Sequence, residues 1–420
     1  MSLGGASLRV CRLGGSRAGE LRLTRFLRNE AVTEGEMLAE ARERTAVRCA
    51  GRDVLAIQDT TVIRSDGGGG GDLHVVLAVD AADGTLLGLV DAQVLRREAG
   101  RREHRRGALV EDKESFRWLQ GADEAAQACA CAERVTVVAD RECDIFEAFA
   151  LRPDGAEMLV RAAQDRALGE GGRLFAALDA LPEAGRCTLD LPAGPGRAAR
   201  TAALALRFAT TTLARPGDAG RDAGLPRAVA VQVVDVREAN PPPGAACVHW
   251  RLLTTHPVGN AAEAWKVAEL YRKRWAIEQL FRTLKTKGFD IEGMRVEHPA
   301  ARDKLGVAAL VAATAVQQLI HARDGYAQGG AGPMRPCTDV FEPEDTALLD
   351  AFCAKLEGKT ARQKNPHPPG SLAYAAWVCA RLGGWTGYYG KPGPIVMFNG
   401  WLEVQAARRT IRLLRWDHDV

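Results

Sequence analysis

The sequence lacks several patterns that mark particular classes of protein. Its ten cysteines form no Cys-x-x-Cys pair and its eight histidines form no cluster at metal-finger spacing, which argues against a zinc site. No apolar run of 18 or more residues stands out, and the first residues lack the apolar core of a secretory signal. The net charge of +3 is small, so any affinity for nucleic acid must come from where the charges lie. These absences favour a cytoplasmic protein with reduced thiols and no membrane partner.

The length of 420 residues and the hydrophobic content of 46% suit two or three folded modules. Residues 1–28 show only weak periodicity. The first predicted helix spans about 33–47, where Thr33 and Glu36 form a capping-box pattern. Further helices are expected at about 112–130, 260–286, 303–323, 343–357 and 371–382, so the second half of the chain is predicted to be mainly helical.

Two aspartates follow apolar segments that read as buried strands. The run 54–57 leads into Asp59, and the run 135–139 leads into Asp140. Between them, strands at about 73–80 and 85–95 are joined through Asp83-Gly84, a strong hairpin signal. Residues 166–256 contain short strand-like pieces separated by Gly, Pro and Ala, which predicts a β-rich insertion.

One predicted helix carries a third acid beside several cations. At about 100° per residue, a sector of about 80° contains Tyr271, Arg274, Glu278, Arg282 and Lys285. A separate sector, formed by Ile277, Leu280 and Leu284, can face the core. Glutamate and arginine four residues apart can also be a solvated ion-pair ladder of little energetic weight.

Three carboxylates from two strands and one helix suit a site for two divalent cations. Mg²⁺, or Mn²⁺ in its place, prefers oxygen ligands, and two such ions can activate the attacking oxygen and stabilise the leaving oxygen in phosphoryl transfer. On this reading Asp59, Asp140 and Glu278 are the catalytic residues and metal ligands. Arg274, Arg282 and Lys285 would bind the DNA backbone, and Tyr271 would pack against or hydrogen-bond a phosphate.

The spacing Tyr-x2-Arg-x3-Glu-x6-Lys, formed by Tyr271, Arg274, Glu278 and Lys285, resembles the YREK signature of DDE transposases of the bacterial insertion-sequence-four family. Neighbouring blocks resemble the same family. They are Gln58-Asp59-Thr60-Thr61, Asp140-Arg141-Glu142-Cys143-Asp144, Lys113 to Trp118 and Gly384 to Tyr388, and they cover most of the chain.

The resemblance implies an α/β fold: an RNase H-like catalytic core, with a mixed five-stranded sheet and helices, interrupted by a β-rich insertion and followed by a helical C-terminal segment. The expected parts are an N-terminal DNA-binding remnant (1–50), the first part of the core (51–165), the insertion (166–256), the second part of the core (257–325) and a dimerisation region (326–420). The implied partners are double-stranded DNA, at the element's ends and its target, and a second copy in a synaptic complex.

The resemblance also assigns DNA contacts outside the signature helix. Trp250 stands where the family carries a tryptophan that stacks on a flipped base during hairpin formation, with a buried strand tryptophan as the alternative. Arg161 and Arg166 resemble positions at the active-site rim, with a solvated charge pair as the alternative. The run from Arg96 to Arg106 can contact DNA or be a solvated charged segment.

The expected function is cut-and-paste transposition, in which metal-dependent cleavage is followed by strand transfer through a hairpin. The family normally carries an end-recognition domain before a block that Thr24 to Asn29 resembles, and here that domain is expected to be missing or replaced. The alternative is therefore an inactive, truncated transposase that binds DNA or inhibits full-length partners by dimerising. A glycosidase with paired carboxylates would leave the basic stripe beside Glu278 unexplained.

Overall fold

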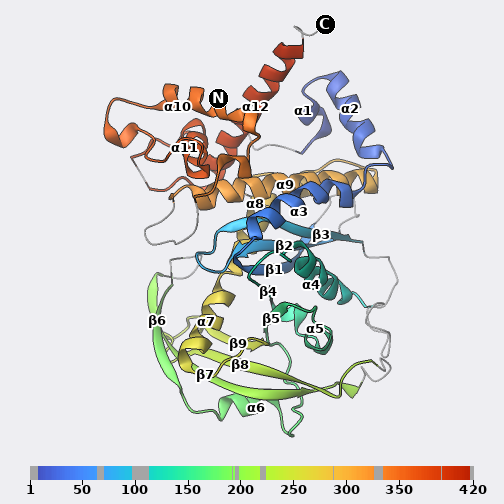
Figure 1. Ribbon diagram of the computed structural model, residues 1–420, viewed down its shortest axis with the longest axis vertical. Coiled ribbons are helices and arrows are strands. Elements are labelled where there is room, and N and C mark those ends of the chain that lie inside the picture. The colour runs from blue at the N-terminus through green and yellow to red at the C-terminus, as the bar shows by residue number, and fades with distance from the viewer. Residues whose placement is uncertain are drawn as a thin grey trace.

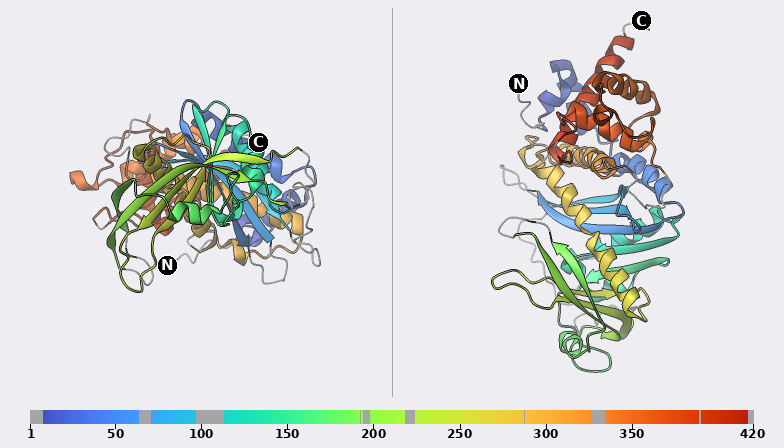
Figure 2. Two further views of the ribbon diagram at one scale, coloured as in Figure 1. Left: turned by 90° about the horizontal axis from the view of Figure 1, so that it is seen from below. Right: turned by 90° about the vertical axis from the view of Figure 1, so that its left-hand side faces the viewer.

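The protein was analysed as a computed structural model, which describes residues 8–416 apart from 64–70, 97–112, 192, 194–197, 218–223, 287, 326–333 and 389. A long mixed sheet occupies one half of the molecule, and helices gather at the other end, as Figure 1 shows. The side view in Figure 2 shows the helical part stacked on the sheet part, with the described chain ends both on the helical side.

Five strands form the first part of the sheet, in the order β3-β2-β1-β4-β5. Their bounds are β1 Asp53–Ile63, β2 Gly71–Asp80, β3 Leu86–Leu95, β4 Arg134–Ala139 and β5 Ala156–Arg161. Strands β1, β2 and β3 are antiparallel neighbours, whereas β4 runs parallel to β1 and β5 runs parallel to β4. The hairpin predicted at Asp83-Gly84 is confirmed, and Gly84 there has a φ of 80°, which favours glycine. This mixed sheet with its helices confirms the predicted RNase H-like α/β class.

The predicted β-rich insertion supplies four more strands to the same sheet. They are β6 Gly185–Leu191, β7 Arg200–Ala214, β8 Ala228–Glu238 and β9 His249–Thr254, and they continue the order as β5-β9-β8-β7-β6. Because β9 pairs with β5 over Leu159–Arg161, the insertion is bonded edge to edge with the core. Among the described residues the two regions therefore share one nine-stranded sheet.

Helices cover both faces of this sheet. On one face lie α4 Phe116–Ala128, α5 Phe146–Ala150 and α6 Leu174–Asp179, which share a core with the even-numbered residues of β1 such as Val54 and Ala56. On the other face lie α7 Ala261–Arg272, α8 Trp275–Lys285 and α9 Pro299–Ala322, which share a core with Leu55 and Ile57. Strand alternation thus determines which side chains meet which helices.

The helical end contains α10 Thr346–Leu356, α11 Leu372–Leu382 and α12 Pro394–Trp416, with α1 Val10–Gly14, α2 Arg17–Arg28 and α3 Glu34–Cys49 (Figure 1). Single 3₁₀ turns occur at Arg141–Cys143, Ile291–Gly293, Cys337–Asp339, Pro343–Asp345 and Ala361–Gln363. The capping box predicted for Thr33 and Glu36 is confirmed at the start of α3. The N-terminal region contains helix α2, although its weak periodicity predicted no helix there. The Ser16 side chain caps this helix by accepting a hydrogen bond from the Gly19 amide.

Two other sequence expectations need correction. The helix predicted over 260–286 is two helices, α7 and α8, which meet at Lys273 and Arg274. The expectation that no long apolar segment exists is also wrong, since α9 is long and apolar enough to cross a bilayer. However, 67% of its apolar window is buried inside the protein, as in a core helix, so its composition is weak support for a membrane span.

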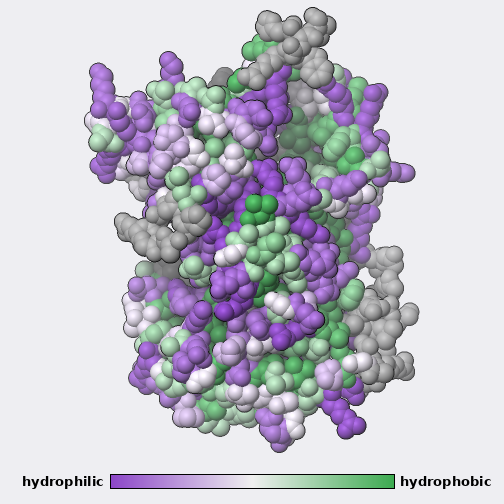
Figure 3. Space-filling view, viewed as in Figure 1, coloured by the Kyte–Doolittle hydropathy of each residue, from purple (hydrophilic) through white to green (hydrophobic). Residues whose placement is uncertain are grey.

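Hydrophilic residues gather at mid-height on the face shown in Figure 3, with smaller hydrophobic areas among them. Exposed large hydrophobic side chains on the described surface include Val62 and Trp275, both on elements that carry a predicted catalytic acid.

Candidate active site

The strand register brings Asp59 and Asp140 together. The parallel ladder between β1 and β4 ends with Gln58 opposite Ala139, so the next residue on each strand is one of the two aspartates. Strand β1 itself continues to Ile63, paired with β2 alone, so Asp59 lies where the parallel ladder ends and not where β1 ends. Because Asp59 follows Ile57 and Asp140 follows Val138 at strand spacing, both aspartates belong to the sheet face covered by α8.

Helix α8 brings Glu278 to the same place. Its buried stripe of Ile277, Leu280 and Leu284, which the sequence predicted, packs against the sheet and leaves Glu278 at the edge of that contact. At the junction with α7, the amides of Lys273 and Arg274 bond to the carbonyls three residues earlier, a 3₁₀-type tightening. Tyr271 therefore lies in the last turn of α7 and Glu278 lies in α8, and both still face the site, because Tyr271 contacts Asp140 and Arg274 contacts Glu278.

The Arg274 guanidinium lies among the three acids. Its Nη1 donates to Asp59 Oδ2 at 2.8 Å, and its Nη2 donates to Glu278 Oε1 at 2.6 Å and lies 3.7 Å from Asp140 Oδ2. The arginine side chain is 11% exposed, and the three acids are 20–32% exposed. One buried cation thus contacts carboxylates from two strands and a helix.

Burial and charge shift the proton affinities at this site. Burial raises the pKa of Asp59 to about 6, although Arg274 and the Thr60 amide oppose the rise, and the charges of Asp140 and Glu278 add to it. Burial alone would lower the pKa of Arg274, but Tyr271 and the three acids raise it above its ordinary value. Arg274 is therefore fully charged, while Asp59 can take up a proton slightly below neutral pH.

The donor atoms of the three acids suit a divalent cation, but their arrangement does not. Three carboxylates are the hard oxygen ligands that Mg²⁺ and Mn²⁺ prefer, so the donor chemistry fits. Yet within the described residues no group of three or more His, Cys, Asp or Glu side chains is close enough to hold a metal ion as arranged. The acids converge on Arg274, and metal binding requires that its guanidinium move aside.

Tyr271 and Trp250 lie next to this cluster. The Tyr271 side chain is buried, and its hydroxyl donates to Asp140 Oδ1 at 3.3 Å. Burial and the Asp140 charge raise the pKa of Tyr271 to about 12. Trp250 on β9 is half-buried, with its ring 6.2 Å from that of Tyr271. The predicted phosphate contact of Tyr271 would require the hydroxyl to leave Asp140.

The other basic positions that the sequence singled out differ in burial and in partners. Arg161 is half-buried at the end of β5 and donates to the His249 carbonyl at 2.9 Å. Arg166 is buried against Asp144 at 2.8 Å, so the alternative of a solvated charge pair is wrong for it. On α8, Arg282 is exposed and lies over the Trp275 ring, and Lys285 bonds the Val62 carbonyl. From the Arg96 to Arg106 run only Arg96 lies inside the described residues, where it pairs with Asp303.

Asp144 and Glu142 are near enough to Asp140 in the sequence to be alternative metal ligands, but both already have partners. Asp144 is buried and accepts the amides of Ala163 and Gln164 as well as Arg166. Glu142 points to solvent and pairs with Arg117 at 3.1 Å. Sequence reasoning assigned no role to Arg117 or to His74, although Arg117 stands in the quoted Lys113 to Trp118 block. Both form a hydrogen-bonded network beside Asp59.

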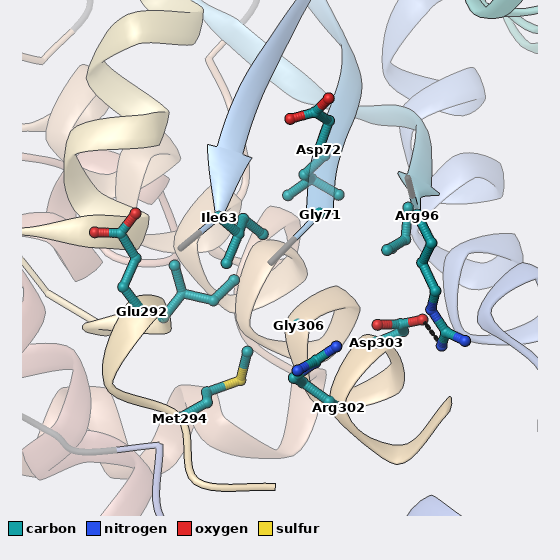
Figure 4. Close-up of a pocket in the computed structure, with 12 residues that line it drawn as sticks. Ile63, Gly71, Asp72, Arg96, Glu292, Met294, Arg302, Asp303 and Gly306 are labelled. Atoms are coloured by element: carbon teal, nitrogen blue, oxygen red, sulfur yellow. Dashed lines mark hydrogen bonds and ion pairs between the residues drawn. The ribbon is translucent and has the colours of Figure 1, made fainter. Parts of the chain in front are cut away.

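A separate cavity lies at the C-terminal end of β1 and is shown in Figure 4. Ile63 and Met294 lie on opposite sides of it, and the ion pair between Arg96 and Asp303 lies at its margin. Its volume is about 40 Å³. None of the three acids lines it, so this cavity is not the centre of the site.

A comparison with known protein families gives one match. Residues 73–314 match the family model described as the transposase DDE domain. The matched region contains Asp140, Arg274 and Glu278, and Asp59 precedes it. Since the match covers more than half of the chain, this protein belongs to the family of transposases with a DDE domain.

Proposed function

We propose that this chain cleaves DNA and joins the cleaved strand to a target, with Asp59, Asp140 and Glu278 as its catalytic acids. The observation that carries the proposal is their convergence on one guanidinium from β1, the end of β4 and α8. A solvated ion-pair ladder on one helix would need only the pair between Arg274 and Glu278. The additional contacts to two strand-borne aspartates instead support a built catalytic site.

The acids would hold one or two divalent cations, with Mg²⁺ or Mn²⁺ best suited to their oxygen donors. Such ions activate an attacking oxygen and stabilise a leaving oxygen in phosphoryl transfer. The protein's own contribution is to bring the acids from β1, the end of β4 and α8 together around the Arg274 guanidinium. Because Asp59 has a raised pKa, a positive charge nearby is needed to keep it ionised near neutral pH.

Arg274 has two functions in this proposal. In the DNA-free protein it neutralises the acids, and when DNA binds it can move its guanidinium to a backbone phosphate. Arginine suits this exchange because its planar fork binds carboxylate and phosphate in the same way. Arg282 and Lys285, about two and three turns beyond Arg274 on α8, would extend the phosphate contact, with Arg161 on the β5 side.

The finer steps are also proposals. A half-buried Trp250 beside Tyr271 supports base stacking near the scissile strand, as a hairpin pathway would need. A second copy bound through the region 326–420, which contains α10, α11 and α12, would allow two DNA ends to be held together.

The test is cleavage of DNA that carries the two ends flanking this gene, in Mg²⁺ or Mn²⁺, by the wild-type protein and the Glu278→Gln variant. We expect metal-dependent nicking that the substitution abolishes. Glu269→Gln is a matched control, because Glu269 lies on α7 in an exposed pair with Arg272 and should leave nicking unchanged. Nicking that persists in Glu278→Gln would contradict the assignment of the acid, and a wild-type protein that binds DNA without cutting it would favour an inactive DNA-binding transposase.

A further inference from the structure

A chain of hydrogen bonds lies on the face of β1 opposite Asp59. Thr60 Oγ1 accepts from Arg117 Nε at 3.2 Å and lies 2.9 Å from His74 Nδ1. His74 Nε2 lies 3.0 Å from Gln58 Oε1, and Gln58 Nε2 donates to the Trp118 carbonyl at 3.2 Å. Gln58 and Thr60 flank Asp59 in the sequence, so the chain holds both neighbours of that aspartate against α4.

The partners fix the direction of every bond in this chain. The Gln58 amide nitrogen must face the Trp118 carbonyl, which leaves its oxygen facing His74. His74 is fully buried, and burial lowers its pKa to about 3, so the ring is neutral and carries one proton. That proton lies on Nε2, opposite the Gln58 oxygen, and Nδ1 therefore accepts the Thr60 hydroxyl proton. The hydroxyl oxygen keeps its lone pairs for Arg117.

The surroundings of the chain are closely packed. The Trp118 ring meets the His74 ring edge-on at 4.6 Å. At Gly121 on α4, an added Cβ would lie 2.5 Å from Gln58 Oε1 and 3.2 Å from His74 Nε2. A residue without a side chain is thus required for the helix to approach the buried Gln58–His74 pair, and the network is enclosed and specific.

Arg117 also reaches the neighbourhood of the second aspartate. Its Nη2 pairs with Glu142 Oε2 at 3.1 Å, and Glu142 lies in the 3₁₀ turn whose cap is Asp140. Its Nη1 donates to the Glu114 carbonyl at 2.7 Å, which fixes the guanidinium at the start of α4. The side chain is only 13% exposed. One guanidinium therefore links the residue after Asp59 to the turn that begins at Asp140.

We propose that Arg117, acting through Thr60 and the buried His74–Gln58 pair, is a positioning residue that sets the spacing of Asp59 and Asp140. This inference rests on the proposed role of the two aspartates as metal ligands. The hydrogen bond from Arg117 to Thr60 should contribute more to this spacing than the ion pair with Glu142 does. The Glu142 side chain is 65% exposed, and an exposed ion pair is weak. Glu142→Gln should therefore change metal binding less than Thr60→Val does.

The experiment measures Mn²⁺ binding to the DNA-free, full-length protein by electron paramagnetic resonance, with circular dichroism to confirm folding. Changes to the partners that orient metal ligands usually reduce metal affinity by about 10- to 100-fold, and we expect this for Arg117→Gln and Thr60→Val. Arg117→Lys, which keeps the charge but not the fork, should recover only part of the loss. Arg52→Gln is the matched control, because Arg52 precedes β1 and pairs with Asp80 at 2.5 Å, far along the strand from Asp59.

The outcomes separate this inference from the proposed function. If Asp59→Asn abolishes Mn²⁺ binding while folded Arg117→Gln and Thr60→Val bind as the wild type does, the positioning role is refuted and the metal site stands. If Asp59→Asn binds Mn²⁺ like the wild type, both proposals fail. A second readout is the ¹⁵N spectrum of the His74 ring, which should show the Nε2-protonated form in the wild type and a mixed population in Thr60→Val. The opposite tautomer in the wild type would overturn the network.

Discussion

Replacing Asp59 by asparagine should stabilise the metal-free protein at neutral pH. The folded pKa is about 6, against about 3.9 for an unfolded aspartate, so the folded state binds the proton more tightly. Ionisation of Asp59 therefore costs the folded state free energy as pH rises from about 4 to about 6. At about 1.4 kcal/mol for each unit by which the two pKa values differ, the cost above pH 7 is on the order of 3 kcal/mol. Asparagine resembles the protonated acid in shape and carries no charge, so the variant avoids this cost.

The assay is urea unfolding of the wild type and Asp59→Asn, in a chelator, at several values from about pH 4 to pH 8. The variant should be more stable above pH 7, and the difference should shrink to about 0.5 kcal/mol near pH 4, where the folded carboxyl is protonated and the unfolded one is about half protonated. Asp154→Asn, at an exposed position before β5, controls for the introduction of an asparagine. If Asp59→Asn proves less stable than the wild type at pH 8, the Arg274 contact outweighs burial and the reasoning fails.

Three further predictions concern the same region. Arg274→Gln should raise Mn²⁺ affinity in the DNA-free protein by about tenfold or more. The reason is that a unit charge about 4 Å from a bound ion repels it by up to about 4 kcal/mol at an effective dielectric constant near 20. An unchanged affinity by electron paramagnetic resonance would contradict this. Wild-type Mn²⁺ affinity should fall as pH drops through about 6, by up to about tenfold per pH unit, because Asp59 must be ionised to bind; calorimetry between pH 5 and 8 tests it. Arg166→Met should destabilise the protein by about 3–5 kcal/mol, because it leaves Asp144 buried and uncompensated, and adding Asp144→Leu should recover part of the loss in urea unfolding.

Much of the framework was predictable because it depends on neighbours in the sequence. The apolar run before Asp59, the Asp83-Gly84 hairpin and the Thr33 capping box are local patterns, and each corresponds to an element of the expected type, although β1 continues past Asp59 to Ile63. The buried stripe of α8 was likewise predicted from helical periodicity alone. The assignment of the acids as metal ligands stays a prediction.

What the sequence by itself determined is that strands lead to Asp59 and Asp140, that a helix carries Glu278, and where the acids lie along these elements. Only the tertiary structure decided that Arg274 contacts all three acids, that Asp144 is buried in an ion pair with Arg166, and that the insertion continues the core sheet. It also decided that Arg117 and His74 form hydrogen bonds with the residues on either side of Asp59, on the opposite face of β1. The physical reason is that Arg274 and Asp59 are 215 positions apart, and a contact over that separation depends on strand register and on helix packing against the sheet, which no local pattern records.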